Sequence, residues 1–274
     1  MAIDPILPAA LVQSSAELVL LDCRTDLGAY AIGHLAGAHH AQLERDLSSA
    51  QAPGADPARG GRHPLPSPAQ FAATLASWGV TPHSHVLAYD DQGGANAAAR
   101  LWWMLRAFGH ERVQVVDGGL SALLAAGHEL TTDVPAKHAG PPYPASRFAL
   151  PLATISDVER ARNSSHERVL DVRAAFRFRG ESEPIDPVAG HIPGAHNLPF
   201  SENLRPDDTF KSGDELREQY QRFLGAIEPD QLIVHCGSGV TACHTLLALE
   251  RAGLPHAKLY VGSYSEWCRG RGHG

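Results

Sequence analysis

The sequence has few lysines, no excess of positive charge and no long apolar run. Among its 274 residues, 23 are Lys or Arg and 30 are Asp or Glu, which gives a net charge of −7. Such a chain offers no basic surface of the kind that binds nucleic acid. No segment approaches the roughly 18 apolar residues of a membrane-spanning helix, so we expect no membrane association. Residues 1–8 lack the basic start and apolar core of a secretory signal, and we therefore expect a cytoplasmic protein.

Cysteine is also scarce, and its spacing excludes several classes of protein. The four cysteines form no C-x-x-C pair and no small disulfide framework. The sixteen histidines show no spacing typical of a zinc site, so we expect no metal and no other cofactor. Each cysteine is then either a buried apolar residue or a reactive thiol. The 26 glycines and 20 prolines indicate many short turns, which disfavours a helical bundle.

What the sequence does contain is an internal repeat. Four segments of the first half recur in the second half, in the same order and at similar separations, which indicates a duplicated domain. We place the first domain at residues 1–134, a proline-rich linker at 135–151 and the second domain at 152–274. The matched segments are Leu18–Arg24 with Arg168–Arg173, Gly33–His40 with Gly190–Asn197, His85–Asp90 with Gln231–Cys236, and Asp117–Leu123 with Val261–Trp267.

Each half alternates short β-branched runs with helical stretches, which is typical of an α/β fold. We expect two tandem domains, each a parallel sheet flanked by helices. Sites in such sheets form at the carboxyl ends of the strands. The expected strands are Leu18–Asp22, Val86–Tyr89, Val113–Val116, Val169–Asp171, Leu232–His235 and Lys258–Val261. The expected helices are Pro68–Trp78 (capped by Ser67), Ala95–Phe108, Glu215–Leu224 and Val240–Ala252.

One strand end carries a thiol. The segment His235-Cys-Gly-Ser-Gly-Val-Thr-Ala242 follows a strand and opens a helix. Its glycines permit a tight loop with inward N–H groups, and the helix start adds more of them. These donors would stabilise the reactive thiolate form of Cys236, whereas the alternative is a buried structural cysteine. The matching loop of the first half has Asp90 instead, so that half is expected to be catalytically silent.

Different chemistries of this loop can be compared residue by residue. A Cys-x5-Arg phosphatase would need an arginine at position 242, where this chain has Ala242. A cysteine hydrolase would need a base on the thiol, but His235 should point to the other side of its strand. Sulfur transfer requires only a thiolate, a cradle for a persulfide and a group that holds the donor. A non-catalytic binding module is a further alternative, although an intact Cys236 loop disfavours it.

These residues resemble the tandem-domain rhodaneses, the family of thiosulfate and mercaptopyruvate sulfurtransferases, over nearly all of both halves. The motifs that carry the resemblance are Gly190–Ala195, Cys236–Thr241 and Val261–Trp267. The resemblance implies a persulfide on Cys236, which cyanide or a thiol then accepts; a thioredoxin-like protein is one candidate acceptor. Thiosulfate enzymes of the family usually have basic residues where this chain has Gly237 and Ser238, so 3-mercaptopyruvate is the preferred donor and thiosulfate the alternative.

The resemblance also implies roles for individual residues. Ser238 and His63 would form a proton relay with an acid, for which the aligned residue is Glu44 rather than the usual aspartate. Arg177 would bind the anionic end of the donor. The loop between Gly180 and Gly190 lacks the second arginine that the family uses for mercaptopyruvate. The remaining donor-binding residues would be those of the loop, Gly237, Gly239, Val240 and Thr241.

Three further side chains are expected to lie outside the reactive site. Arg173 is expected to pair with Asp171 at the end of its strand. Cys243, inside the following helix, is expected to pack in the core; the alternative is a redox partnership with Cys236, which the separation of about two helical turns disfavours. Cys268, near the carboxyl terminus, is a candidate for an exposed thiol.

Overall fold

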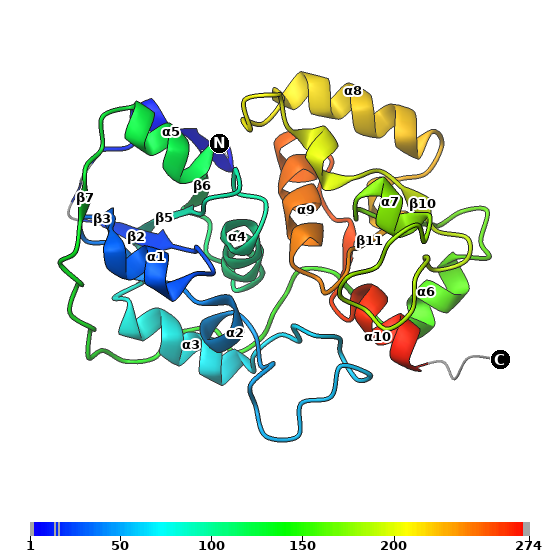
Figure 1. Cartoon of the computed structure of the whole chain (residues 1–274), viewed down its shortest axis with the longest axis horizontal. Helices are drawn as coiled ribbons and strands as arrows, with labels where there is room; N and C mark the ends of the chain where they lie inside the picture. The colour runs from blue at the N-terminus through cyan, green and yellow to red at the C-terminus, as the bar shows by residue number, and fades with distance from the viewer. Residues whose placement is uncertain (1–2, 14, 16, 271–274) are drawn as a thin grey trace. The chain divides into compact units, whose positions relative to one another are not determined.

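A computed structural model of the chain describes residues 3–13, 15 and 17–270 and divides it into two compact units (Figure 1). Residues 1 and 2 of the amino-terminal stretch considered above lie outside the described residues. Each unit has its own sheet and its own core, and each takes a short segment from the other half of the chain. The first unit comprises residues 1–48, 66–149 and 206–210, and the second comprises residues 49–65, 150–205 and 211–274.

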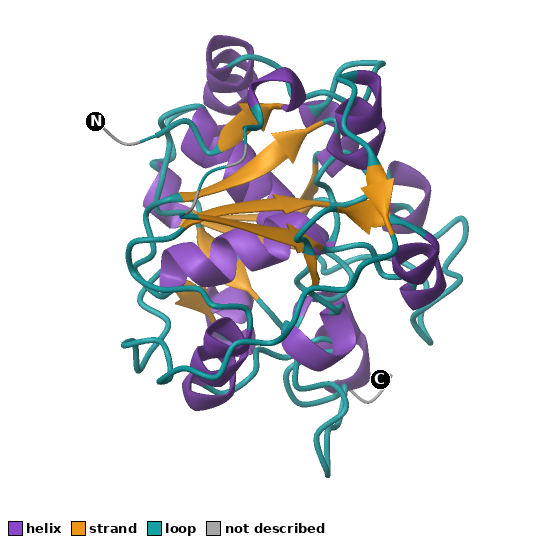
Figure 2. Cartoon of the chain, turned by 90° about the vertical axis from the view of Figure 1, so that its left-hand side faces the viewer, coloured by secondary structure: helices purple, strands orange, loops and turns teal. Residues whose placement is uncertain are grey.

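The first unit is built on a five-stranded parallel sheet with the strand order β1-β6-β5-β2-β4. Strand β5 lies at its centre and forms its longest pairing with β2, and helices cover the sheet (Figure 2). The strands are β1 (Ile6–Pro8), β2 (Leu18–Asp22), β4 (His39–His40), β5 (His85–Tyr89) and β6 (Val113–Asp117). The helices are α1 (Leu27–Ile32), α2 (Leu43–Asp46), α3 (Pro68–Ser77), α4 (Ala97–Ala107) and α5 (Gly119–Ala125).

The second unit repeats this sheet strand for strand. Its order, read from the corresponding edge, is β8-β12-β11-β9-β10, and all its pairs are parallel. The duplication predicted from the sequence therefore extends to the topology of the sheets. The strands are β8 (Leu152–Ala153), β9 (Arg168–Asp171), β10 (His196–Asn197), β11 (Leu232–His235) and β12 (Lys258–Tyr260). The helices are α6 (Ile155–Ala161), α7 (Ala175–Phe178), α8 (Gly213–Leu224), α9 (Thr241–Arg251) and α10 (Ser263–Gly270).

Short additional elements complete the two units. Strands β3 (His34–Leu35) and β7 (Leu130–Thr131) form a small antiparallel pair in the first unit. Short 3-10 turns cover Ala9–Leu11, Phe200–Asn203 and Pro229–Gln231. No helix of the described chain has both the length and the apolar composition needed to cross a bilayer.

The predicted elements are all present, with ends that differ by up to two residues. The N-cap assigned to Ser67 is confirmed, because its hydroxyl accepts the N–H of Gln70 in a full capping box and Pro68 takes the first helical position. The edge strands were missed, since β1, β4, β8 and β10 span only two or three residues and show no periodicity. Tertiary pairing, rather than local propensity, makes these residues extended.

The proline-rich stretch between the halves follows the first unit. The N–H of His138 donates to the carbonyl of Ser77 at 3.0 Å, and the N–H of Tyr143 donates to the carbonyl of Ala72 at 3.1 Å. These bonds attach the stretch to α3. By contrast, residues 49–65 come from the first half of the chain but pack with the second unit. This exchange, which no local pattern indicates, brings first-half residues to the site described below.

Candidate active site

Cys236 lies between the end of β11 and the start of α9, at the carboxyl edge of the second sheet. Its side chain is 2% exposed. The sulfur accepts the N–H groups of Ser238 at 3.4 Å and of Gly239 at 3.2 Å. The loop therefore curls around Sγ, as the two glycines predicted, and α9 begins five residues further on, at Thr241 after Val240. Two N–H donors and a helix start favour an anion at this sulfur.

Helix α10 holds this loop from the side. The N–H groups of Tyr264 and Ser265 donate to the carbonyls of Cys236 and Gly237 at 3.0 and 2.9 Å. The N–H of Cys236 itself donates to Oγ of Ser263 at 3.2 Å. Gly239 has φ +75°, and a Cβ there would lie 2.5 Å from the carbonyl oxygen of Val261. The motif Val261–Trp267 thus acts as a clamp that fixes the backbone around the thiol, a role that the sequence did not reveal.

The matching loop of the first unit shows what the same backbone does without a thiol. The carboxylate of Asp90 is fully buried and accepts four N–H groups at 2.8 to 3.3 Å. Burial raises the pKa of Asp90, and these N–H groups oppose the rise. The anion cradle of the first unit is therefore filled by its own side chain. The four donors are Gln92, Gly94, Asn96 and Ala98.

Ser238 and His63 come together within the second unit. Nδ1 of His63 lies 2.8 Å from Oγ of Ser238, and the serine is 6% exposed. His63 belongs to the 49–65 segment, so this first-half residue folds with the second-half loop, as the relay required. Glu44 lies in α2 of the first unit, and its place in the relay stays a prediction.

Arg177 is held by two carboxylates. On α7, its guanidinium donates to Glu183 through Nε at 3.1 Å and through Nη2 at 2.6 Å. Nη2 also lies 3.6 Å from Oδ2 of Asp186. Burial raises the pKa of Glu183, but the bonds from Arg177 and from two N–H groups outweigh it, so that pKa lies below its usual value. Residues 180–190, which lack the family's second arginine, therefore supply two carboxylates that orient Arg177.

A second guanidinium near the loop was not anticipated. A Cβ built on Gly237 would lie 3.1 Å from Nη2 of Arg62 and 3.6 Å from Nη2 of Arg177. Arg62 also forms an ion pair with Asp186. Arg62 directly precedes His63, a predicted relay residue. This position in the sequence was the one indication that Arg62 lies near the site. It could not be interpreted because nothing local places residues 49–65.

The pair at the end of β9 is structural. Arg173 donates to Asp171 through Nε and through Nη2, the latter at 2.6 Å, and both side chains are at most 1% exposed. This confirms the predicted pairing. Asp22 and Arg24 form the same pair in the first unit, with Nη2 at 2.6 Å from the carboxylate. In each unit the arginine also donates to a glycine carbonyl, Gly190 or Gly33.

His235 does not serve as a base on the thiol. Its Nδ1 lies 3.1 Å from the carbonyl oxygen of Cys236 rather than from the sulfur. Its Nε2 has no hydrogen-bond partner and lies 3.9 Å from the carboxylate of Asp171. Burial lowers the pKa of His235, which favours a neutral ring. Ala242 stands, buried, where a phosphatase would need arginine, so the loop also lacks the phosphate-binding group.

All four cysteines are free and buried. Cys243 packs inside α9, as predicted, with its thiol donating to the carbonyl of Gly239 at 3.4 Å. The suggestion that Cys268 is exposed was wrong: it is 6% exposed because α10 turns it into the core of the second unit. Within the described part of the chain, no group of three or more His, Cys, Asp or Glu side chains is arranged to hold a metal ion.

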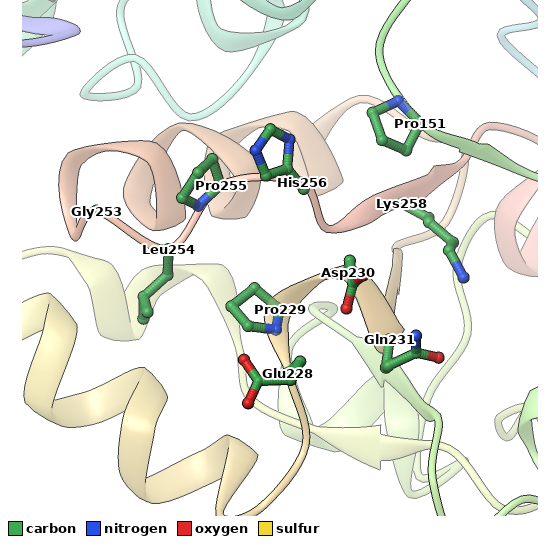
Figure 3. Close-up of a pocket in the computed structure, with 10 residues that line it drawn as sticks. All are labelled: Pro151, Glu228, Pro229, Asp230, Gln231, Gly253, Leu254, Pro255, His256 and Lys258. Atoms are coloured by element: carbon green, nitrogen blue, oxygen red, sulfur yellow. The ribbon is translucent and has the colours of Figure 1, made fainter.

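The second unit also has an open pocket of about 720 Å³ (Figure 3). None of the residues described above for the Cys236 site lines this pocket. Gln231 and Lys258, which line it, stand at the amino ends of β11 and β12, whereas Cys236 follows the carboxyl end of β11. Its wall mixes acidic, basic and proline side chains, and no predicted site residue contributes to it. The pocket is lined by Pro151, Glu228, Pro229, Asp230, Gln231, Gly253, Leu254, Pro255, His256 and Lys258.

Comparison with known proteins decides the family. The model of the rhodanese-like domain matches residues 9–126 and again residues 154–269. The chain belongs to the rhodanese family. Rhodanese domains therefore occupy both halves, and the two parallel sheets described above are two copies of one fold. This confirms the resemblance inferred from the loop and from the repeat.

Relatives of this rhodanese are sulfurtransferases. It is 44% identical to a Pseudomonas aeruginosa protein named "Probable 3-mercaptopyruvate sulfurtransferase", over 93% of this chain and 90% of that one. It is 38% identical to the thiosulfate sulfurtransferase of Gallus gallus, over 74% and 70% of the two chains. The crystal structure of SseA from Escherichia coli, described as a 3-mercaptopyruvate sulfotransferase, is 32% identical with a TM-score of 0.78, over 96% and 99%. The predicted enzyme class, a sulfurtransferase with a sulfur donor and an acceptor, is confirmed.

Proposed function

We propose that this rhodanese takes a sulfur atom from 3-mercaptopyruvate onto Cys236 and passes it to a thiol or to cyanide. The observation that carries the proposal is the coordination of Sγ of Cys236 by the N–H groups of Ser238 and Gly239 at the start of α9. The same donors that favour a thiolate can bind the terminal sulfur of a persulfide, which is also anionic. A buried thiol in such a loop is suited to hold a reactive sulfur away from water.

In the first step the thiolate of Cys236 attacks the sulfur of the donor. A sulfur–sulfur bond forms, and the carbon–sulfur bond of mercaptopyruvate breaks. The electron pair of the broken bond passes to the enolate of pyruvate, which must then gain a proton at carbon. The donor thiol loses one proton in the same turnover, so the protons balance. A general acid at the leaving carbon lowers the barrier to this step.

In the second step the acceptor removes the outer sulfur. A thiolate or cyanide ion attacks that sulfur, the sulfur–sulfur bond breaks, and its electron pair returns to Cys236 as thiolate. The products are a persulfide of the acceptor thiol or thiocyanate. We propose a small thiol or a thioredoxin-like protein as the acceptor and the cytoplasm as the location, which the four free cysteines support.

The preference for mercaptopyruvate is supported by the hydroxyl and imidazole beside the thiol. Oγ of Ser238, 2.8 Å from Nδ1 of His63, can deliver a proton to the enolate and be reprotonated by the ring. Glu44 is the proposed acid that orients the ring. Arg177 would bind the donor carboxylate, with the backbone of Gly237, Gly239, Val240 and Thr241 around the sulfur. Thiosulfate is the second candidate, since several relatives are named thiosulfate sulfurtransferases and two guanidinium groups near Gly237 suit any anionic donor.

The proposal is tested by steady-state kinetics with the two donors side by side, with cyanide as the acceptor. We expect kcat/KM to be higher for mercaptopyruvate than for thiosulfate. A clear preference for thiosulfate would replace the first donor by the second. Transfer from neither donor, with no gain of one sulfur atom in the intact mass, would overturn sulfur transfer altogether.

The proton relay gives a prediction that separates the donors. Ser238→Ala and His63→Ala should each lower kcat/KM for mercaptopyruvate by about 100-fold, the contribution of a positioned general acid. With thiosulfate, whose sulfite leaves as a stable anion, the change should stay within about threefold, because no proton is needed. Glu44→Gln should follow the same pattern if it orients His63. Equal losses with both donors would show that these side chains only support the loop.

A further inference from the structure

Ser263, the first residue of α10, has a backbone conformation that favours glycine. Its φ is +53°, and the residue is fully buried. Residues with a Cβ rarely adopt this left-handed region, because the Cβ lies too close to a neighbouring carbonyl oxygen. Such strain persists where other contacts of the residue compensate for it. A serine at this position therefore points to a role for its hydroxyl group that glycine could not fill.

The hydroxyl group of Ser263 connects the nucleophile to the neighbouring strand. Its Oγ accepts the N–H of Cys236 at 3.2 Å and donates to the carbonyl of Tyr260, at the end of β12, at 2.9 Å. Because the hydroxyl proton is directed at Tyr260, a lone pair of Oγ faces the N–H of Cys236. Both partners are buried, so neither group can turn to water if the hydroxyl is lost.

Together with Tyr264, Ser263 fixes both peptide planes of Cys236. Ser263 holds the N–H on one side of the Cα of Cys236, and the N–H of Tyr264 holds the carbonyl on the other side at 3.0 Å. A residue has only two soft backbone dihedrals, φ and ψ, and these two bonds restrict both of them. They therefore set the direction in which the Cβ–Sγ bond of Cys236 leaves the backbone.

The contacts at the sulfur itself are too weak to set this direction alone. Sγ accepts the N–H groups of Ser238 and Gly239 at 3.4 and 3.2 Å, and a thiol sulfur is a weak hydrogen-bond acceptor. In a persulfide the outer sulfur lies about 2 Å beyond Sγ, so a small rotation at Cα moves the reacting atom further than it moves Sγ. The alignment of the attack therefore depends on the bonds to the backbone of Cys236.

The first unit shows the same arrangement without the hydroxyl. Its matching residue is Gly119, with φ +57°, and the N–H of Leu120 donates to the carbonyl of Asp90 at 2.8 Å. A Cβ at Gly119 would lie 2.3 Å from that carbonyl oxygen, so the first unit has no room for a serine there. Asp90 does not need a second backbone bond of this kind, because its carboxylate accepts four N–H groups. The hydroxyl thus occurs in the unit that carries the reactive thiol.

We propose that Ser263 is a positioning residue for sulfur transfer, whose hydroxyl aligns Cys236 for attack and for release of the outer sulfur. This inference rests on the function proposed above, in which Cys236 is the nucleophile. Misplacement of a reacting atom by about 1 Å can lower a rate by about 100-fold, so one buried hydroxyl can affect the chemical step strongly. Because Ser263 acts on the nucleophile and not on the donor, its effect is the same for both donors.

The test compares Ser263→Gly with Ser263→Ala. Both variants lose the hydroxyl, but glycine also relieves the left-handed backbone, so Ser263→Gly should melt about 2–4 °C above Ser263→Ala. We expect both variants to lower the single-turnover rate of persulfide formation, measured by intact mass, by the same factor of about 10- to 100-fold. KM should stay within about threefold, and the losses should be equal for mercaptopyruvate and thiosulfate. Glycine occupies the matching position of the first unit, so Ser263→Gly keeps a backbone that this fold already uses.

His256→Gly is the matched control. His256 also has a positive φ, +78°, but it is exposed and lines the pocket at the amino end of β12, away from the catalytic loop. Its replacement relieves a left-handed backbone without removing a contact to Cys236. This variant should melt at or above the temperature of the unmodified enzyme, with an unchanged rate of persulfide formation.

The comparison of rate with melting temperature decides the inference. A rate that follows the melting temperature, with Ser263→Ala impaired and Ser263→Gly close to the unmodified enzyme, would show that Ser263 only stabilises α10 and would overturn the inference. Rates within threefold of the unmodified enzyme in both variants would also overturn it, and so would a loss with one donor alone. In each case the unmodified enzyme still transfers sulfur, so the proposed function stands. An unmodified enzyme that accepts sulfur from neither donor would overturn both.

Discussion

Replacing Cys236 by serine should abolish sulfur transfer from both donors, with a fall in kcat/KM on the order of 1,000-fold or more. A serine hydroxyl in the same cradle keeps the size and the N–H contacts from Ser238 and Gly239, but it is neither ionised nor able to form a persulfide. The measurements are cyanide-dependent turnover and the intact mass after exposure to each donor. The unmodified enzyme should gain one sulfur atom, and the variant none.

The control for this experiment is Cys23→Ala. Cys23 is a buried thiol of the first unit, where burial raises the pKa and thus disfavours the thiolate. This variant should retain both turnover and the sulfur adduct. Substantial turnover by Cys236→Ser, or loss of the adduct in Cys23→Ala alone, would contradict the assignment of Cys236 as the nucleophile.

Replacing Arg173 by methionine should destabilise the second unit by about 3–5 kcal/mol, the usual cost of breaking a buried ion pair. The side chain is 1% exposed and bonds Asp171, Glu183 and the carbonyl of Gly190. Its guanidinium also stacks on the ring of Tyr264, 4.0 Å from the centroid. Without it, the fully buried carboxylate of Asp171 loses its partner. Urea unfolding, followed by far-ultraviolet circular dichroism, measures the change in the free energy of unfolding.

Arg160→Met is the matched control for this prediction. Arg160 pairs with Asp157 and with Glu167, but its side chain is 55% exposed. An exposed pair contributes at most about 1 kcal/mol, since solvent screens it. Equal and small losses in the two variants would show that the pair of Asp171 and Arg173 does not stabilise the end of β9.

Much of this enzyme could be predicted because its signals are local. The strand ending at His235, the glycines beside Cys236 and the apolar helix after them lie within one short segment, and strand–loop–helix geometry follows from such a segment alone. The repeat then extended the prediction to the whole chain, because two copies of one pattern must form two similar sheets. Asp90 in the matching loop was likewise interpretable, and its four N–H donors show the same cradle filled by a carboxylate.

By itself, then, the sequence determined the two parallel sheets, the thiol at a strand end and the pairing of Asp171 with Arg173. Only the tertiary structure decided that residues 49–65 fold with the second unit, which brings His63 to Ser238 and Arg62 to Gly237. It also decided that α10 clamps the catalytic loop and buries Cys268. The physical reason is the separation of the interacting residues along the chain. Periodicity and helix capping act over a few residues. The contacts listed here join segments far apart in the sequence, which become neighbours only once the unit has folded.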